Sequence, residues 1–308
     1  MPVLTLTVGL PGCGKTTWAR EAVRTAKSKT VIVNMDDIRE TMAGSHKNYK
    51  FNSDNETYVQ TVQCSAAEHA AQKKWNIIVA DTNLNPKVRK KWVDFAKENG
   101  YTVKYQNFFE DFKDGKVFAH EYFAVKDFVK LCKSRNILRD KAVPESVIDR
   151  MADDYLYSTL TMPVHESATV LDDAIIVDID GTLAHMSGRS PYDGTRVLED
   201  TPDMEVILSV LMEYKYLNRK VIIMSGRKDD CRELTLQWLR RYDIPTEHVY
   251  MRAADDNRSD DIVKYELYMQ HVYGRFNVRK VFDDRTQVVN MWRKLCKLKV
   301  YQVNPGDF

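Results

Sequence analysis

Short apolar runs alternate with longer amphipathic segments along most of the chain. In the first half the apolar runs predict strands over 3–8, 30–33, 77–80 and 101–107. A 3.6-residue repeat of apolar positions predicts helices over 16–27, 54–74 and 86–99. The second half repeats this alternation, with strands near 174–179, 220–224, 248–250, 278–282 and 299–303 and helices near 203–217, 229–242, 259–273 and 286–296. The pattern predicts an α/β protein with parallel sheets.

One segment, 161–173, interrupts this alternation. It contains Pro163, Ser167 and Thr169 and has no sustained periodicity, which is typical of a linker. The chain has 308 residues, about twice the usual length of a single domain. We therefore expect one domain over 1–160, a linker over 161–173 and a second domain over 174–308.

Composition excludes several classes of protein. With 44% hydrophobic and 29% charged residues, the chain is expected to be globular rather than disordered or fibrous. Its longest apolar runs are far shorter than the roughly 20 residues that span a bilayer, so we expect no membrane segment. The 5 cysteines are widely spaced without any C-x-x-C pair, which favours the cytoplasm and no zinc site. The net charge of +2 does not identify a partner.

The first candidate for chemistry follows the first predicted strand. Residues 9–16, GLPGCGKT, fit the pattern G-x-x-x-x-G-K-[ST] and open a predicted helix. Glycines let backbone N–H groups approach phosphate oxygens, Lys15 would reach the β- and γ-phosphates, and Thr16 would offer its hydroxyl to Mg²⁺. A glycine-rich turn followed by a chance Lys-Thr is the alternative, but the strand and helix on either side favour nucleotide binding. The residues expected to hold the nucleotide are Gly9, Gly12, Gly14, Lys15, Thr16 and Thr17.

Acids follow the next two predicted strands, where ligands collect in open α/β sheets. Asp36 is suited to take a proton from an acceptor hydroxyl. Alternatively Asp36 and Asp37 cap the helix that begins there, and we assign Asp37 mainly to capping. Arg39, one turn on, is expected to bind an anionic part of the acceptor. Asp81 could position Arg39 or assist the metal, and the residues leave both roles open.

Segment 126–141 is rich in lysine and arginine. Such a run is usually a solvated helix face. In a phosphotransferase it can also close over the phosphates and supply an arginine to the transition state. For that role Arg139 is our first candidate and Arg135 the second.

The second candidate for chemistry is IIVDIDGT over 175–182. Asp178 and Asp180 follow an apolar strand and, being two apart on an extended segment, are expected to face one site. Like charges so close are costly unless a cation or a proton lies between them, and Mg²⁺ prefers oxygen ligands. Asp178 would attack phosphorus to give an aspartyl-phosphate, and Asp180 would act as acid and base. A Ca²⁺ loop is the alternative, but the preceding strand and the missing later ligands disfavour it.

Three further positions are expected to complete this second site. Ser225-Gly226-Arg227 follows a predicted strand and could hold phosphate oxygens. Lys264, on a predicted helix, could neutralise developing charge. Asp283 and Asp284 follow another strand and would finish the Mg²⁺ coordination. Asp-Asp pairs also cap helices and Ser-Gly-Arg is often a turn, so the order of the whole set at strand ends is what favours one site.

At this point the residues resemble known families. The DxDGT string with Ser225, Lys264 and the Asp283-Asp284 pair is similar to haloacid-dehalogenase-type aspartate phosphatases. Together with the strings GKTTWARE, DTNLNP, KAVP and DRTQVV, it resembles the polynucleotide kinase-phosphatases of the T-even bacteriophage type. The resemblance implies a P-loop NTPase-like parallel sheet followed by a haloacid-dehalogenase-like Rossmannoid sheet.

The resemblance also implies a function and a set of residues. The implied enzyme phosphorylates 5′-OH ends of DNA or RNA with ATP and removes 3′-phosphate and 2′,3′-cyclic phosphate ends, with Mg²⁺, often as a homotetramer. If the chain is encoded by a phage, its location would be the host cytoplasm. The implied kinase residues are Lys15, Thr16, Asp36, Arg39, Asp81 and Arg139. The implied phosphatase residues are Asp178, Asp180, Arg189, Ser225, Arg227, Arg252, Asp260, Lys264, Asp283 and Asp284. Relatives have a basic residue directly before the general base. Here that residue is Met35, whose side chain could pack on the face of a nucleobase.

Two other functions are compatible with the motifs. A small-metabolite kinase fused to a metabolite phosphatase would carry the same core residues, since neither motif specifies a polymer. A nucleotide-switched nucleic-acid-binding protein would bind without turnover. The complete set of acids in both sites argues against the non-enzymatic alternative.

Overall fold

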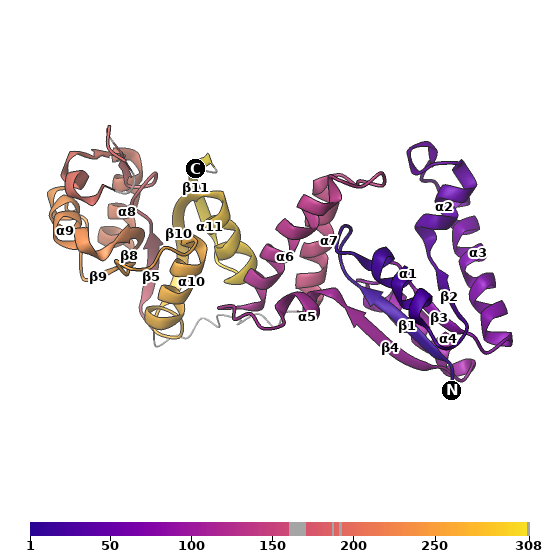
Figure 1. The fold of residues 1–308 in the computed structure, drawn as a ribbon. Helices are drawn as coiled ribbons and strands as arrows, with labels where there is room; N and C mark the ends of the chain where they lie inside the picture. Colours follow the sequence, from indigo (N-terminus) through magenta and orange to yellow (C-terminus); the bar gives the residue numbers. More distant parts are fainter. Residues whose placement is uncertain (160–170, 187, 191–192, 307–308) are drawn as a thin grey trace. The chain divides into compact units, whose positions relative to one another are not determined.

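The chain forms two compact units, residues 1–160 and 161–308 (Figure 1). The structure, a computed structural model, describes residues 1–159, 171–186, 188–190 and 193–306. Most of the predicted linker, including Pro163, Ser167 and Thr169, lies outside the described residues.

The first unit is built on a parallel sheet of four strands in the order β2-β3-β1-β4. Its strands are β1 (Val3–Val8), β2 (Thr30–Val33), β3 (Asn76–Val79) and β4 (Thr102–Asn107). Both faces of the sheet are covered. Leu6 and Val79 pack with Trp92 on one face, and Ile78 packs with Ala19 on the other. The prediction of a parallel α/β sheet is confirmed.

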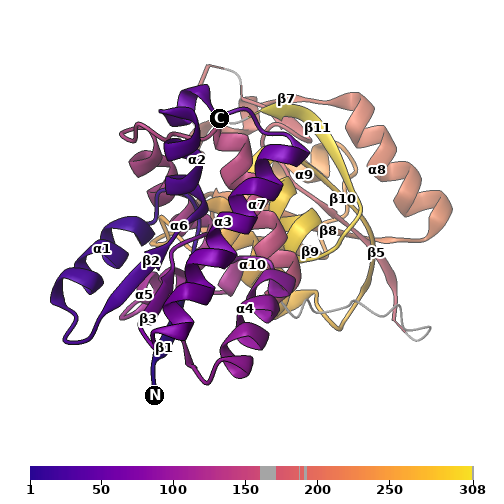
Figure 2. The same ribbon diagram turned by 90° about the vertical axis from the view of Figure 1, so that its right-hand side faces the viewer.

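Helices connect these strands (Figure 2). They are α1 (Lys15–Thr25), α2 (Met35–Ala43), α3 (Ser53–Gln72), α4 (Pro86–Glu98), α5 (Phe108–Lys113), α6 (Glu121–Asn136) and α7 (Glu145–Thr159). Asparagine side chains cap four of them, because Asn34, Asn52, Asn85 and Asn107 accept N–H groups in the first turns of α2, α3, α4 and α5. Helix α6 buries the consecutive residues 122–125, so it lacks the one-sided repeat by which helices are recognised in a sequence.

The second unit contains a parallel sheet of five strands in the order β11-β10-β5-β8-β9. They are β5 (Asp173–Val177), β8 (Lys220–Lys228), β9 (His248–Arg252), β10 (Asn277–Arg285) and β11 (Val300–Gly306). The short strands β6 (Ala184–His185) and β7 (Thr201–Pro202) pair separately. Strands β8 and β10 run beyond the predicted ends at 224 and 282, so Ser225 and Asp283 lie within strands. The pairing of β8 with β9 and of β10 with β11 continues past the apolar residues, with a shift of register after Ser225 and after Asp283.

The helices of the second unit cover its sheet. They are α8 (Met204–Leu217), α9 (Arg232–Arg241), α10 (Asp260–His271) and α11 (Thr286–Asn290). The predicted helix 229–242 divides into a 3-10 turn, Asp229–Cys231, and α9. The predicted helix 286–296 divides into α11 and a π-helical turn, Met291–Leu295. No helix among the described residues is long and apolar enough to cross a bilayer.

We expect the second unit to depend on Trp238. Its ring is fully buried in the core and its Nε1–H donates to the carbonyl of Asp200 at 3.0 Å. Trp238→Ala should reduce the free energy of unfolding by about 3 to 5 kcal/mol, because a large cavity replaces the ring. Hydrogen exchange of backbone amides within β5 and β8 would measure the loss. As a control, Tyr216→Ala, whose side chain is 75% exposed, should leave exchange in these strands unchanged.

Candidate active sites

Four acids and one lysine meet at the carboxyl end of β5 in the second unit. Asp178 directly follows β5, Asp283 lies in the neighbouring strand β10, and Lys264 lies on α10. The Lys264 ammonium is 2.9 Å from Asp178 Oδ1, 3.0 Å from Asp283 Oδ2 and 3.6 Å from Asp260 Oδ2. Adjacent parallel strands end at one edge of the sheet, which explains why residues more than a hundred positions apart meet here.

Three of the carboxylates fit a divalent cation. Asp178, Asp283 and Asp284 each offer one oxygen atom, and these atoms lie within 4.8 Å of one another. Asp283 Oδ2 accepts from Lys264 and, at 3.2 Å, from Trp292 Nε1, whereas the buried Oδ1 has no hydrogen-bond partner among the described residues. A buried carboxylate oxygen without a partner is costly unless something binds it. The donors are all oxygen, which suits Mg²⁺.

The electrostatics of the cluster also favour a bound cation. Burial raises the pKa of Asp178, Asp283 and Asp284, and repulsion among the acids adds to this effect. Burial lowers the pKa of Lys264, but the attraction of Asp178, Asp283 and Asp260 outweighs it and holds that pKa well above its usual range. Lys264 therefore stays charged, and one ammonium does not balance all the acids around it.

Asp180 belongs to a neighbouring network of arginines. Arg227 donates to both of its carboxylate oxygens, at 2.7 and 2.8 Å, and Arg189 donates to Oδ1 at 3.2 Å. Asp200 accepts from the same two arginines at 2.7 Å. The shared cation of Asp178 and Asp180 stays a prediction, and in this structure both oxygens of Asp180 accept hydrogen bonds from arginine. Asp200, fully buried at its side chain, has no motif that could have revealed it.

The remaining predicted residues of this site hold one another. Arg252 donates to Asp260 Oδ1 at 3.0 Å and to the carbonyl of Gly226 at 2.9 Å. Ser225 is fully buried, and its Oγ accepts the N–H of Arg227 at 3.2 Å. These contacts connect the end of β8 with the end of β9 and the start of α10. Among the described residues, the structure brings all predicted members of the second site to one end of this sheet.

The first unit forms the predicted phosphate loop. Gly12 and Gly14 have φ values of +84° and +106°, a region that favours glycine. A Cβ on Gly12 would lie 2.4 Å from the carbonyl oxygen of Cys132 on α6. Lys15 is buried and donates to the carbonyl of Leu10 at 2.7 Å, so its ammonium lies across the loop. Thr16 and Thr17 lie in the first turn of α1, where N–H groups attract anions.

Asp36 and Arg39 lie together on α2. Arg39 donates to Asp36 Oδ1 at 2.8 Å and to both oxygens of Glu56 on α3, at 3.0 and 2.7 Å. Tyr49 also donates to Glu56, at 2.8 Å. Half of the Asp36 side chain is exposed, against 14% of Arg39. Asp36 is thus accessible while Arg39 is held in place.

Glu56, which sequence reasoning missed, is the acid that positions Arg39. The notion that Asp81 does so is not supported by its contacts, because Asp81 accepts from the Met35 N–H at 3.0 Å and from Gln63 at 2.5 Å. Burial raises the pKa of Asp81 despite these hydrogen bonds. The assignment of Asp37 to capping is wrong: Asn34 caps α2, and Asp37 instead pairs with Lys141 at 3.0 Å.

The basic segment 126–141 is part helix and part turn. Helix α6 ends at Asn136, and beyond it Arg139 donates to the Asn136 side chain at 3.3 Å. Lys141 pairs with Asp37 and Glu40 on α2, each at 3.0 Å. The segment thus contacts the helix that carries Asp36, whereas Arg135, the second candidate, stays within α6.

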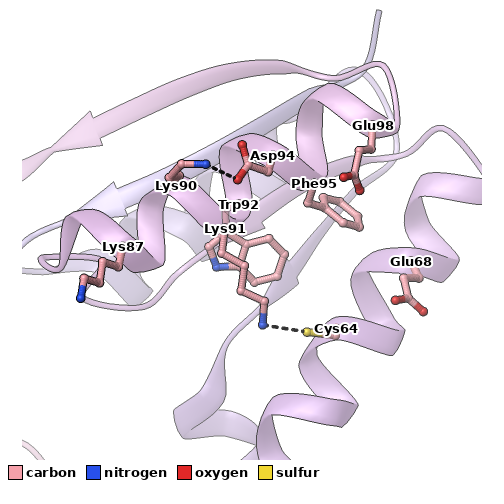
Figure 3. Close-up of a pocket in the computed structure, with 9 residues that line it drawn as sticks. All are labelled: Cys64, Glu68, Lys87, Lys90, Lys91, Trp92, Asp94, Phe95 and Glu98. Atoms are coloured by element: carbon pink, nitrogen blue, oxygen red, sulfur yellow. Dashed lines mark hydrogen bonds and ion pairs between the residues drawn. The ribbon is translucent and has the colours of Figure 1, made fainter.

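A surface pocket of about 510 Å³ lies between α3 and α4 (Figure 3). Both signs of charge line it, and within it Lys90 pairs with Asp94 at 2.8 Å while Lys91 lies 3.4 Å from the sulfur of Cys64. No predicted site residue lines this pocket. The phosphate loop therefore stays our candidate site in the first unit.

Comparisons with known proteins agree with this geometry. Residues 172–308 match the family described as the polynucleotide kinase PNKP phosphatase domain, and residues 4–156 match the family described as an AAA domain. Over 97% of its length, the chain is 28% identical to a bifunctional polynucleotide kinase/RNA ligase of Autographa californica nuclear polyhedrosis virus. The chain spans only 42% of that viral protein. It is also 24% identical, over 74% of its length and 83% of the relative, to L-seryl-tRNA(Sec) kinase of Methanococcus maripaludis.

Solved structures are also similar. A chain in the structure of the Pnkp1/Rnl/Hen1 RNA repair complex is 29% identical with a TM-score of 0.46, and the match covers 100% of this chain and 97% of that one. A class C acid phosphatase from Bacillus anthracis is 15% identical with a TM-score of 0.33, over 46% of this chain and 70% of that one.

A phosphate loop in one unit and a lysine-bound acid cluster in the other define a two-domain phosphotransfer enzyme. The family matches make the assignment more specific: residues 172–308 match a polynucleotide kinase PNKP phosphatase domain and residues 4–156 match an AAA domain, and together they support an enzyme of the polynucleotide kinase-phosphatase type. Domains of these two kinds use ATP and typically a divalent metal.

Gly181 offers a test of the acid cluster. Its φ is +82°, and a Cβ there would lie 2.1 Å from Asp284 Oδ2. Gly181→Ala should displace Asp284 and lower the hydrolysis of p-nitrophenyl phosphate at least tenfold, while the kinase activity persists. Gly188→Ala is the matched control, because Gly188 also has a positive φ, +64°, but has open space around it. Equal losses in the two variants would contradict the close approach of Gly181 to Asp284.

Proposed function

We propose that the enzyme repairs nucleic-acid ends, phosphorylating 5′-OH termini with ATP and removing 3′-phosphates. The observation that carries this proposal is that the acid cluster lies within residues 172–308, the part of the chain that matches the PNKP phosphatase family. The viral relative named as a polynucleotide kinase supports nucleic acid as the acceptor.

In the kinase step, the phosphate loop and Lys15 bind the β- and γ-phosphates of ATP. The carboxylate of Asp36 takes the proton of the 5′-hydroxyl, whose oxygen then bonds to the γ-phosphorus as the bond to the β-phosphate oxygen breaks. Arg39, held by Glu56, orients the acceptor beside Asp36. Arg139 supplies positive charge to the transferred phosphoryl group, and the hydroxyl of Thr16 would hold a Mg²⁺ ion bound with the nucleotide.

In the phosphatase step, Asp178 attacks the phosphorus of a 3′-phosphate and forms an aspartyl-phosphate as the bond to O3′ breaks. Asp180 gives O3′ a proton, then takes one from the water that hydrolyses the intermediate. The arginines around Asp180 orient it for both transfers, and Lys264 compensates the negative charge. When bound by Asp178, Asp283 and Asp284, Mg²⁺ supplies further positive charge.

The family resemblance is our basis for proposing the substrates and the location of the enzyme. We propose that both DNA and RNA ends are substrates, that 2′,3′-cyclic phosphates are also hydrolysed, and that the enzyme acts in the cytoplasm. The homotetramer stays a prediction. A metabolite kinase fused to a metabolite phosphatase is the alternative. It requires faster turnover of a free nucleoside or sugar than of an oligonucleotide, a comparison that separates the two functions directly.

The two sites should be separable. On an oligonucleotide with a 5′-OH and a 3′-phosphate, Asp36→Asn should abolish 5′ phosphorylation and spare 3′ dephosphorylation. Asp178→Asn should do the reverse, because an amide is neither a base nor a nucleophile. End labelling with ATP and Mg²⁺ measures both reactions, and each variant is the folding control for the other. Loss of both activities in either variant would contradict two independent sites.

Glu56 should act through Arg39. Glu56→Gln removes a charge that binds the guanidinium in two hydrogen bonds, so kcat/KM for the oligonucleotide should fall about 10- to 100-fold. The KM for ATP should not change. Glu21→Gln, which removes an acid paired with Arg24 on the exposed face of α1, should keep kcat/KM within about twofold. A rise in the KM for ATP in Glu56→Gln would place Glu56 at the nucleotide instead.

A further inference from the structure

An exposed aromatic ring lies beside the predicted acceptor site. Phe51, in the segment between α2 and α3, is 75% exposed, whereas Tyr49 in the same segment is buried. The two rings meet edge to face with centroids 5.0 Å apart. The Arg39 guanidinium carbon lies 5.3 Å from the centroid of the Phe51 ring and 5.9 Å from that of Tyr49.

These contacts hold the ring of Phe51 in place. Arg39 is bound by Asp36 and Glu56, and Tyr49 donates to the same Glu56, so the ring packs against groups that are themselves fixed. A single exposed phenylalanine is common on protein surfaces and by itself indicates nothing. Phe51 differs because its ring is exposed and also packs against Arg39, which contacts Asp36, the proposed general base.

We propose that Phe51 stacks on a nucleobase near the 5′ end of the acceptor strand. The inference rests on the proposed 5′-kinase function and specifies which part of the substrate the kinase domain binds. Arg39 lies between Asp36 and Phe51, 2.8 Å from the carboxylate oxygen and 5.3 Å from the ring. The ring is therefore within reach of the first few nucleotides of a strand whose terminal hydroxyl lies at Asp36.

The chemistry of the ring specifies the kind of contact. Phe51 has no hydrogen-bonding group, so it cannot distinguish bases by their edges, but every base has a π face. Arg39 behind the ring adds a favourable cation–π contact. The substrate class that fits is an unpaired base of any sequence, as in a single strand or a frayed end, and the contribution of Phe51 should appear as acceptor affinity.

The first arm of the test measures kinetics. Phe51→Ala should raise the KM for a single-stranded 5′-OH oligonucleotide roughly 5- to 150-fold, the effect of losing one stacked base. The kcat at saturating acceptor, the KM for ATP and the 3′-phosphatase activity should stay within twofold. Phe51→Trp should retain the low KM because it keeps the stacking face. Tyr105→Ala is the control, since Tyr105 is 53% exposed on β4, the edge strand farthest in the sheet from β2.

The second arm separates stacking from support of Arg39. Oligonucleotides that lack the base at the first, second or third position are compared in wild type and Phe51→Ala. If Phe51 stacks on one of these bases, removal of that base should raise the KM in wild type but have little further effect in the variant. Equal effects of base removal in both proteins at all three positions would overturn the proposal.

The outcomes also distinguish this proposal from the function on which it rests. A wild-type enzyme that phosphorylates no oligonucleotide would overturn both. A wild-type enzyme that phosphorylates oligonucleotides, with a KM unaffected by Phe51→Ala, would overturn only the role of Phe51. A fall in kcat without a rise in KM would make Phe51 a support for Arg39 and would likewise overturn stacking.

Discussion

The second domain depends on charge compensation around Lys264. This ammonium is 1% exposed and contacts Asp178, Asp283 and Asp260, which come from three different elements. Burying a charge without a partner costs several kcal/mol, so these acids can meet only because the lysine is there. Their negative charge exceeds that of one lysine, and this excess favours the divalent cation that we propose to bind there.

A related arrangement organises the first domain. Arg39 is held by Glu56 and contacts Asp36, which stays half exposed and therefore available to an acceptor hydroxyl. Attraction to Glu56 and Asp36 raises the pKa of Arg39 even though burial lowers it, so the guanidinium keeps its charge. In both domains a partly or fully buried cation fixes the geometry, and the reactive carboxylate lies next to it.

The two proposed reactions use the same feature of parallel sheets. The phosphate loop follows β1, Asp36 follows β2 and Asp178 follows β5, each at the carboxyl end of its strand. Strand order then decides which of these ends adjoin. In the second sheet, β5 lies between β10 and β8, so Asp178 lies next to the strand that carries Asp283 and Asp284. Phe51 adjoins the first site because the segment after α2 places its ring against Arg39.

Local patterns in the sequence were enough to predict the strands of the two parallel sheets and most of the long helices, and they singled out the motif residues, whereas the short strands β6 and β7 were not predicted. Apolar runs predict buried strands because successive side chains point to opposite faces of a sheet that is covered on both sides. The glycines before Lys15 predict a phosphate loop because few other residues adopt a positive φ. Helix α6 escaped this reasoning, since its buried residues 122–125 leave no one-sided pattern. The predicted roles of the site residues remain proposals.

The sequence by itself determined where reactive side chains follow strands, because that depends on neighbouring residues alone. Only the tertiary structure decided their partners: Glu56 rather than Asp81 for Arg39, Arg189 and Arg227 for Asp180, and Asp200 beside both arginines. The physical reason is that an ion pair forms between groups brought close in space. Residues such as Asp180 and Arg227, 47 positions apart, meet only after strand order and register have placed them together.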